Sequence, residues 1–202
     1  IGTIAGASHK WKNKLGVIYI DAHPDMNTPE TSLTGNVHGM SLAISLGLGE
    51  TDLINCLFSG AKIDSERIVI LGAKNIDEGE LKIIQKNKVK MFTMAEIDSR
   101  GIGACVKEAL EYLGMNGVKK LHVSLDLDSI DLSIAPGAAI PNKGGFTYRE
   151  IVHTMKSLYE FGISSLDVVE LNPVNDIQNM TEKLATELII LGLTGKYLDY
   201  LR

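Results

Sequence analysis

Residues 16–27 read GVIYIDAHPDMN, and this stretch decides the fold. Its first five residues contain no charged side chain, which is typical of a strand buried on both faces of a parallel sheet. Pro24 lacks a backbone N–H and marks about where the strand must leave its hydrogen-bonded ladder. The stretch therefore predicts a strand over 16–20 that ends at three polar side chains, Asp21, His23 and Asp25, which converge if the backbone stays extended.

Four further short apolar runs occur along the chain, at 67–72, 89–92, 121–127 and 166–171. Helical patterns alternate with them at 38–48, 78–87, 101–114, 147–161 and 181–193. Thr147 and Glu150 form a capping-box pattern, and Thr181 is expected to cap the last helix in the same way. The alternation predicts an α/β protein with three layers, α/β/α, and a mostly parallel sheet, in a single domain over 1–202.

The composition excludes several classes of protein. The 202 residues are 45% hydrophobic and 22% charged, and the net charge of −5 leaves no basic stripe for nucleic-acid phosphates. No apolar stretch approaches the roughly 20 residues of a membrane-spanning helix. Cys56 and Cys105 lie far apart and fit free thiols in a reducing cytoplasm, with a single disulfide as the alternative. We therefore expect a cytoplasmic protein with no nucleic-acid or membrane partner.

A second polar cluster, SLDLD at 124–128, follows the predicted strand 121–127. Residues two apart on a strand share a face, so Asp126 and Asp128 should point the same way. A long loop follows each cluster, and ligands of open α/β sheets bind beyond the carboxyl ends of the strands. We therefore expect the two clusters to form one site.

Four carboxylates in one partly buried place repel one another unless something neutralises them. Two divalent cations would neutralise them, and carboxylates with an imidazole suit Mn²⁺. The predicted metal ligands are Asp21, His23, Asp25, Asp126 and Asp128. The alternative is that these aspartates only cap helices at loop ends; the pairing of two such motifs at strand ends favours the metal site.

The motifs DAHPD and SLDLD resemble the D-A-H-x-D and S-x-D-x-D motifs of the ureohydrolases, the arginase and agmatinase superfamily. The resemblance extends over SLTGNVHG (32–39), GAKNIDEGE (72–80), MAEIDSRGIG (94–103), GGFTYRE (144–150) and LDVVELNP (166–173). It implies an arginase-like fold and a hydrolase that converts L-arginine to L-ornithine and urea with a hydroxide bridging two Mn²⁺ ions. It also implies a homotrimer and a place in arginine metabolism, such as the urea cycle.

The resemblance assigns roles to single residues. Of the metal ligands, it implies that Asp21 and Asp126 bridge the ions, that Asp25 serves one ion, and that His23 and Asp128 serve the other. For the substrate it implies contacts from Asn27, Thr34 and Asn36 to the α-carboxylate, and from Asp77 and, through water, Glu80 to the α-amino group. The implied catalytic residues are Glu170 facing the guanidinium group, His38 transferring protons, and Asp128. Agmatine lacks the carboxylate that such donors bind, so the loop that carries Asn27, Thr34 and Asn36 favours an arginase over an agmatinase. Without the resemblance to the family, His38 would equally be a histidine at the start of a helix, satisfied by loop carbonyls.

The chain departs from the family pattern in a few places. Family members carry a further metal-binding histidine in a G-G-D-H segment that would precede Ile1, so we expect the N-terminal part to be missing. His9 lies too late in the sequence to replace that histidine and is expected on the surface. Leu132 replaces a proline, and Ile140 replaces a threonine near the expected substrate position. These departures motivate two alternatives, an arginase-like pseudoenzyme with a structural or interaction role and a ureohydrolase acting on another guanidino compound.

Overall fold

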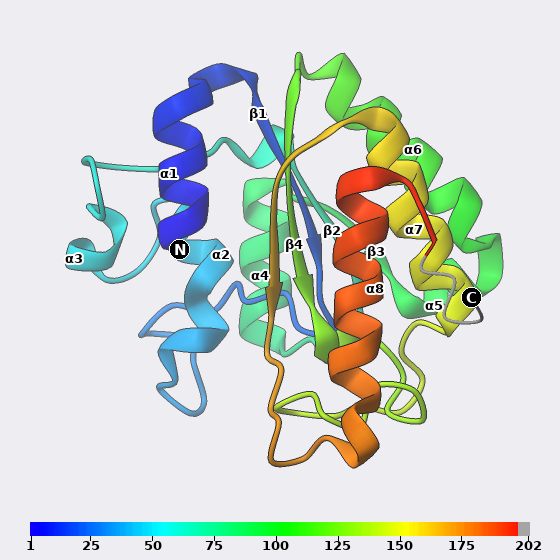
Figure 1. The fold of residues 1–202 in the computed structure, drawn as a ribbon. Coiled ribbons are helices and arrows are strands. Elements are labelled where there is room, and N and C mark those ends of the chain that lie inside the picture. Colours follow the sequence, from blue (N-terminus) through cyan, green and yellow to red (C-terminus); the bar gives the residue numbers. More distant parts are fainter. Residues whose placement is uncertain (198–202) are drawn as a thin grey trace.

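A five-stranded sheet lies at the centre of the computed structural model, which describes residues 1–197 (Figure 1). Neighbouring strands are all parallel, in the order β3-β2-β1-β4-β5. In chain order the strands are β1 (Leu15–Ile20), β2 (Ile68–Ala73), β3 (Lys90–Thr93), β4 (Lys120–Asp126) and β5 (Ile163–Val169). All five correspond to the predicted strands, with ends shifted by at most three residues, and the parallel sheet is confirmed.

Helices cover both faces of this sheet, which confirms the three predicted layers (Figure 1). One face carries α1 (Gly2–Trp11), α2 (Ser41–Ser45) and α4 (Glu78–Asn87). The other face carries α5 (Met94–Arg100), α6 (Ile102–Met115), α7 (Tyr148–Phe161) and α8 (Met180–Thr194). A short helix, α3 (Thr51–Ile54), follows α2. The helices α1, α3 and α5 were not among those predicted from periodicity.

The predicted helix over 38–48 is wrong in length. A 3₁₀ turn over Val37–Met40 leads into α2, which ends at Ser45. Gly47 follows with a φ of 81°, a left-handed conformation that glycine adopts at no steric cost and that stops the helix. The helix α2 is therefore little more than one turn long.

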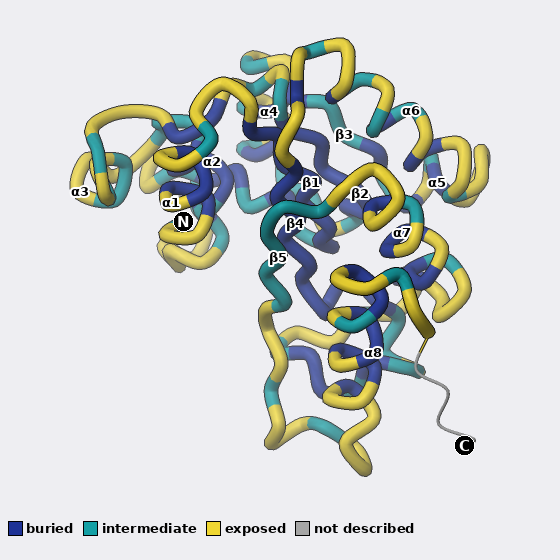
Figure 2. The backbone as a smooth tube through the Cα atoms, turned by 45° about the horizontal axis from the view of Figure 1, so that its top comes forward, coloured by how far each residue is buried: buried dark blue, intermediate teal, exposed yellow. Residues whose placement is uncertain are grey.

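Successive strand residues alternate between two apolar cores. Ile18 and Ile20 pack towards α5–α8, whereas Val17 and Tyr19 pack towards α1, α2 and α4. Figure 2 shows the central strands buried and β5, at the edge of the sheet, only half buried. Because Asp21 continues the alternation of Val17 and Tyr19, its carboxylate lies on the α1, α2 and α4 side.

Helix caps agree with the sequence pattern at α7 but not at α8. Thr147 and Glu150 form the predicted capping box. The prediction for Thr181 is wrong: its hydroxyl accepts a hydrogen bond from the Gly137 N–H at 2.7 Å. The Asp176 carboxylate accepts from the first N–H groups of α8 instead, because the preceding loop brings a charged acceptor to this end.

Two predictions from composition are confirmed in the described part of the chain. Cys56 and Cys105 are free cysteines. Within residues 1–197, none of the helices has the length and apolar character needed to cross a membrane.

Candidate active site

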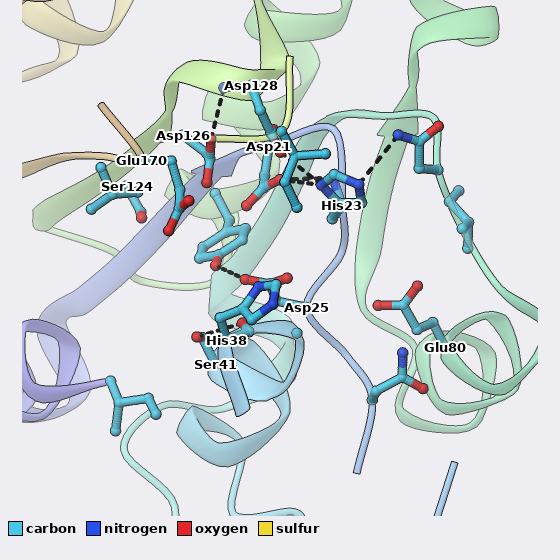
Figure 3. A pocket seen from close by; sticks show the side chains of 18 of the residues that line it. Asp21, His23, Asp25, His38, Ser41, Glu80, Ser124, Asp126, Asp128 and Glu170 are labelled. Atoms are coloured by element: carbon cyan, nitrogen blue, oxygen red, sulfur yellow. Dashed lines mark hydrogen bonds and ion pairs between the residues drawn. The ribbon is translucent and has the colours of Figure 1, made fainter. Parts of the chain in front are cut away.

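The two polar clusters meet at the carboxyl ends of neighbouring strands. Ile20 pairs with Leu125 in the parallel register of β1 and β4, so Asp21 and Asp126 follow side by side. A cavity of about 550 Å³ opens at this edge of the sheet (Figure 3). The predicted site residues that line it are Asp21, His23, Asp25, Asn27, His38, Asp77, Glu80, Asp126, Asp128 and Glu170. Thr34 and Asn36 are not among its lining residues.

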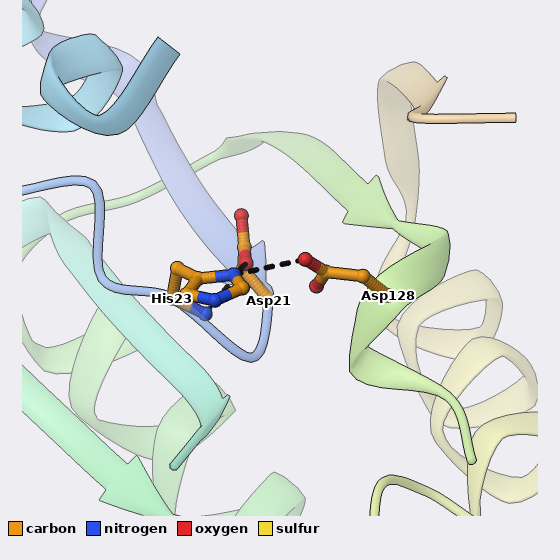
Figure 4. Close-up of side chains that lie close together, drawn as sticks. All are labelled: Asp21, His23 and Asp128. Atoms are coloured by element: carbon orange, nitrogen blue, oxygen red, sulfur yellow. Dashed lines mark hydrogen bonds and ion pairs between the residues drawn. The ribbon is translucent and has the colours of Figure 1, made fainter. Parts of the chain in front are cut away.

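Three of the predicted metal ligands form a compact group. The Nδ1 atom of His23 lies 2.8 Å from Asp128 Oδ2 and 3.6 Å from Asp21 Oδ1 (Figure 4). One potential ligand atom from each of the three residues lies within 4.8 Å of the others. Asp21 and Asp128 are buried, and His23 is half buried at the cavity wall. This geometry can hold one cation between two carboxylates and an imidazole.

In three of the carboxylates, one oxygen accepts a hydrogen bond from a backbone amide. Asp21 Oδ1 accepts from the His23 N–H at 2.7 Å, and Asp126 Oδ1 accepts from the Asp128 N–H at the same distance. In both turns the side chain of an aspartate accepts from the backbone N–H two residues later, which explains why each turn begins with an aspartate. Asp128 Oδ1 accepts from the Ala22 N–H at 3.3 Å, which ties the two motifs together. In each case the second oxygen of the carboxylate can serve a cation.

The protonation of these groups fits a site built for cations. Burial, followed by the charges of Asp21 and Asp128, raises the pKa of Asp126 to about 10. Burial also raises the pKa of Asp25 to about 7 and that of Asp21 well above its usual range. Hydrogen bonds to Asp128 and Asp21 raise the pKa of His23 to about 10. A divalent cation reverses these effects, since an opposite charge favours the ionised carboxylate and the neutral imidazole.

The other ring nitrogen of His23 faces Asn75, a residue that the sequence did not single out. The Asn75 amide nitrogen lies 3.2 Å from His23 Nε2 and donates to Asn142 Oδ1 at 3.0 Å. Such a contact fixes the plane of the imidazole ring and directs Nδ1 towards the carboxylates. The signal was available, because Asn75 follows β2 at the same carboxyl edge of the sheet.

The backbone does not stay extended through Asp25, so the condition under which the three side chains were expected to converge is not met. Asp25 has a φ of 51°, in the left-handed region that aspartate adopts more readily than most residues. Its carbonyl oxygen accepts from the Leu42 and Ala43 N–H groups, at 3.0 and 3.1 Å, at the start of α2. The Tyr19 hydroxyl donates to Asp25 Oδ2 at 2.6 Å, another contact that the sequence did not reveal.

The residues predicted to bind the α-amino group form a tight cap on α4. Asp77 Oδ1 accepts from the Glu80 N–H at 2.8 Å, and Asp77 Oδ2 accepts from the Asn27 side-chain amide at 2.8 Å. The two oxygens of Glu80 accept from the N–H groups of Met26, at 3.1 Å, and Asp77, at 3.2 Å. The capping box therefore joins α4 to the loop that follows the DAHPD motif.

The remaining predicted residues lie around the rim. Thr34 and Asn36 lie in the exposed loop before α2, where Thr34 Oγ1 accepts from the Asn36 N–H at 3.2 Å. His38 is exposed in the 3₁₀ turn that follows, and its side chain lines the cavity. Glu170 is exposed directly after β5, with a φ of 63°. Figure 3 shows Glu170 beside Asp126 and Ser124, at the β4 and β5 side of the cavity.

The structure also places the three residues named with the departures from the family pattern, Ile140, His9 and Leu132. Ile140 lines the cavity with 47% of its surface exposed, so an apolar group does face the expected substrate position. His9 is exposed on α1 and borders a separate surface pocket, as predicted. Leu132 is half buried in the loop after β4 and does not line the cavity.

Comparison with known proteins agrees with these observations. The Arginase family model matches residues 1–193. The chain is 47% identical over 199 residues to the arginase of Bacillus subtilis (strain 168), covering 98% of this chain and 66% of that protein. It is 43% identical over 190 residues to the arginase of Bacillus caldovelox, covering 94% of this chain and 63% of that protein. The chain thus spans somewhat less than two-thirds of the length of these curated relatives.

Solved structures of arginases are also similar to this chain. A crystal structure of arginase from Bacillus subtilis superposes with a TM-score of 0.92 at 46% identity, covering 97% of this chain and 66% of that one. The Entamoeba histolytica arginase in complex with L-ornithine gives a TM-score of 0.85 at 32% identity, covering 93% and 63% of the two chains. The formimidoylglutamase of Bacillus subtilis, at 23% identity and a TM-score of 0.80, shares the fold. By motifs, fold and similarity along nearly its whole length, the chain belongs to the arginase family.

Proposed function

We propose that this protein hydrolyses L-arginine to L-ornithine and urea, using two Mn²⁺ ions held at the carboxyl edge of its sheet. The observation that carries the proposal is the convergence of Asp21, His23 and Asp128, whose potential ligand atoms lie within 4.8 Å of one another at the wall of a cavity, in a chain of the arginase family. We further propose that the protein acts in the cytoplasm as a homotrimer within arginine metabolism.

The residues expected to hold the cations are Asp21, His23, Asp25, Asp126 and Asp128. Oxygen-rich coordination with an imidazole suits Mn²⁺ better than a metal that selects thiolates. Bound divalent cations lower the pKa of a coordinated water and so supply a nucleophile near neutral pH. The protein contributes carboxylates already turned towards one another, with one oxygen of Asp21 and Asp126 held by backbone amides.

Orientation of the guanidinium group is assigned to Glu170. A carboxylate pairs well with a planar guanidinium, and fixing this group beside the cations lowers the entropic part of the barrier. His38, which is exposed and lines the cavity, is proposed to deliver a proton to the leaving amine, with assistance from Asp128.

Recognition of the amino-acid end is assigned to the loop between β1 and α2 and to the start of α4. Asp77 would pair with the α-amino group, and Glu80 supports it by holding its backbone N–H. Asn27 donates one amide hydrogen to Asp77 and would donate the other to the α-carboxylate. Thr34 and Asn36 lie on the exposed loop, from which they would donate hydrogen bonds to the α-carboxylate when substrate enters.

The test is urea release by the full-length protein from L-arginine and from agmatine, with Mn²⁺ and with a chelator. We expect Mn²⁺-dependent urea from arginine, and a selective loss for arginine when Asn36 is replaced by alanine. No Mn²⁺-dependent urea from arginine would contradict the proposal and favour the pseudoenzyme.

A second candidate is a ureohydrolase for another guanidino compound, and Ile140 is the observation that favours it. Its exposed apolar side chain lines the cavity where a hydroxyl was expected, so a substrate with an apolar group there would fit better. A higher kcat/KM for agmatine than for arginine would support this candidate over the first.

A further inference from the structure

Tyr19 occupies a position from which it controls one of the proposed metal ligands. It lies on β1, two residues before Asp21, and its ring is buried on the face that α1, α2 and α4 cover. Its hydroxyl donates to Asp25 Oδ2 at 2.6 Å. A phenol that is buried needs a hydrogen-bond partner, and here the partner is the carboxylate.

Asp25 differs from the other carboxylates in how it is held. Backbone amides hold one oxygen of Asp21, Asp126 and Asp128. The Asp25 side chain instead accepts a hydrogen bond from the hydroxyl of Tyr19. A side-chain donor can be removed by substitution, whereas the backbone amides cannot, so Asp25 is the ligand whose support can be tested directly.

The backbone at Asp25 makes this support necessary. Its left-handed conformation, with φ at 51°, turns the residue out of the direction of β1. The first N–H groups of α2 hold its carbonyl oxygen, which fixes the main chain but leaves the side chain free to rotate. The Tyr19 hydroxyl removes that remaining freedom by fixing one oxygen and leaving the other available.

We propose that Tyr19 is a positioning residue that holds one oxygen of Asp25 and presents the other to a divalent cation. This inference rests on the proposed function only in taking Asp25 as a metal ligand. Partners that orient a ligand typically change metal affinity by about 10–100-fold. The loss should fall on the cation that Asp25 serves and spare the one held by Asp21, His23 and Asp128.

The experiment measures Mn²⁺ binding to the full-length protein by calorimetry and by the electron paramagnetic resonance signal of free Mn²⁺. Tyr19→Phe keeps the buried ring and removes the hydroxyl. Tyr112→Phe removes a hydroxyl from α6, which does not line the cavity, and is the matched control. We expect Tyr19→Phe to weaken one Mn²⁺ site about 10–100-fold, with the second site and the control unchanged.

A second variant separates positioning from a general loosening of the fold. In an Asp25→Ala background the ligand is gone, so adding Tyr19→Phe should not weaken Mn²⁺ binding further. Unchanged binding in Tyr19→Phe, or an equal loss at both sites, would overturn the inference. Wild-type protein that binds Mn²⁺ but releases no urea would contradict the proposed function and leave the role of Tyr19 intact.

Discussion

Glu80 gives the sharpest link between the fold and the proposed substrate pocket. Its side chain is 5% exposed, and its two oxygens accept from the N–H groups of Met26 and Asp77. Replacing it by alanine leaves both donors without this acceptor. Met26 is fully buried, so water cannot easily replace the lost bond there, whereas Asp77 is only half buried.

The expected loss in free energy of unfolding follows from these two hydrogen bonds. A hydrogen bond to a charged group contributes about 1.5–3 kcal/mol. Burial raises the pKa of Glu80, which means that keeping the carboxylate ionised in this place offsets part of the gain. We therefore expect Glu80→Ala to lower the free energy of unfolding by about 2–4 kcal/mol, or Tm by about 4–16 °C for a chain of this size.

The assay is urea unfolding and thermal melting of the metal-free protein, with Glu78→Ala as the matched control. Glu78 lies in the same turn of α4 but is exposed and pairs with Lys82, so its loss should change stability by less than about 0.5 kcal/mol. Glu80→Gln keeps one acceptor oxygen and should fall between the two. A Glu80→Ala variant as stable as Glu78→Ala would refute this explanation and leave a direct substrate contact as the role of Glu80.

Three further predictions concern the site and its support. Asp128→Ala should weaken Mn²⁺ binding by about 100-fold or more, since it removes a ligand and not merely a group that orients one; calorimetry that detects no loss would exclude Asp128 as a ligand. Without metal, stability should fall as pH rises from about 5 to 9, because Asp25 and Asp126 have pKa values of about 7 and about 10 in the fold, above those of the unfolded chain, so the folded state binds more protons. Mn²⁺ should therefore raise Tm more at pH 8.5 than at pH 6, and a smaller rise at pH 8.5 would contradict this. Gly72→Ala should cost about 2–5 kcal/mol, because φ is 96° and a Cβ would lie 2.5 Å from a buried phenylalanine ring, whereas Gly114→Ala, with open space around it, should not destabilise.

The metal motifs could be predicted because their geometry is local. Asp21 and Asp126 each accept from the N–H two residues later, at the end of a strand whose apolar run is plain in the sequence. Strand periodicity and the carboxyl-edge rule then bring the two motifs together without knowledge of any other contact. The same reasoning predicted the strands to within three residues and α4, α6, α7 and α8 to within one residue.

The contacts of Tyr19 and Thr181 could not be predicted, because their partners depend on turns outside any regular period. Tyr19 reads as one more strand residue until the left-handed turn at Asp25 brings a carboxylate back to its hydroxyl. Thr181 matches a capping pattern, yet the loop before α8 supplies Asp176 to its helix and leaves the hydroxyl to Gly137. In both cases tertiary contacts decide between local alternatives of similar energy.

The most direct measurement is a diffraction experiment at the manganese absorption edge on crystals of the full-length protein soaked in Mn²⁺. We expect an anomalous peak bounded by Asp21, His23 and Asp128, where the ligand atoms already lie within 4.8 Å of one another. A second peak should lie beside Asp25. Fully soaked crystals with no peak at the first position would contradict the metal centre on which the proposed hydrolysis of arginine depends.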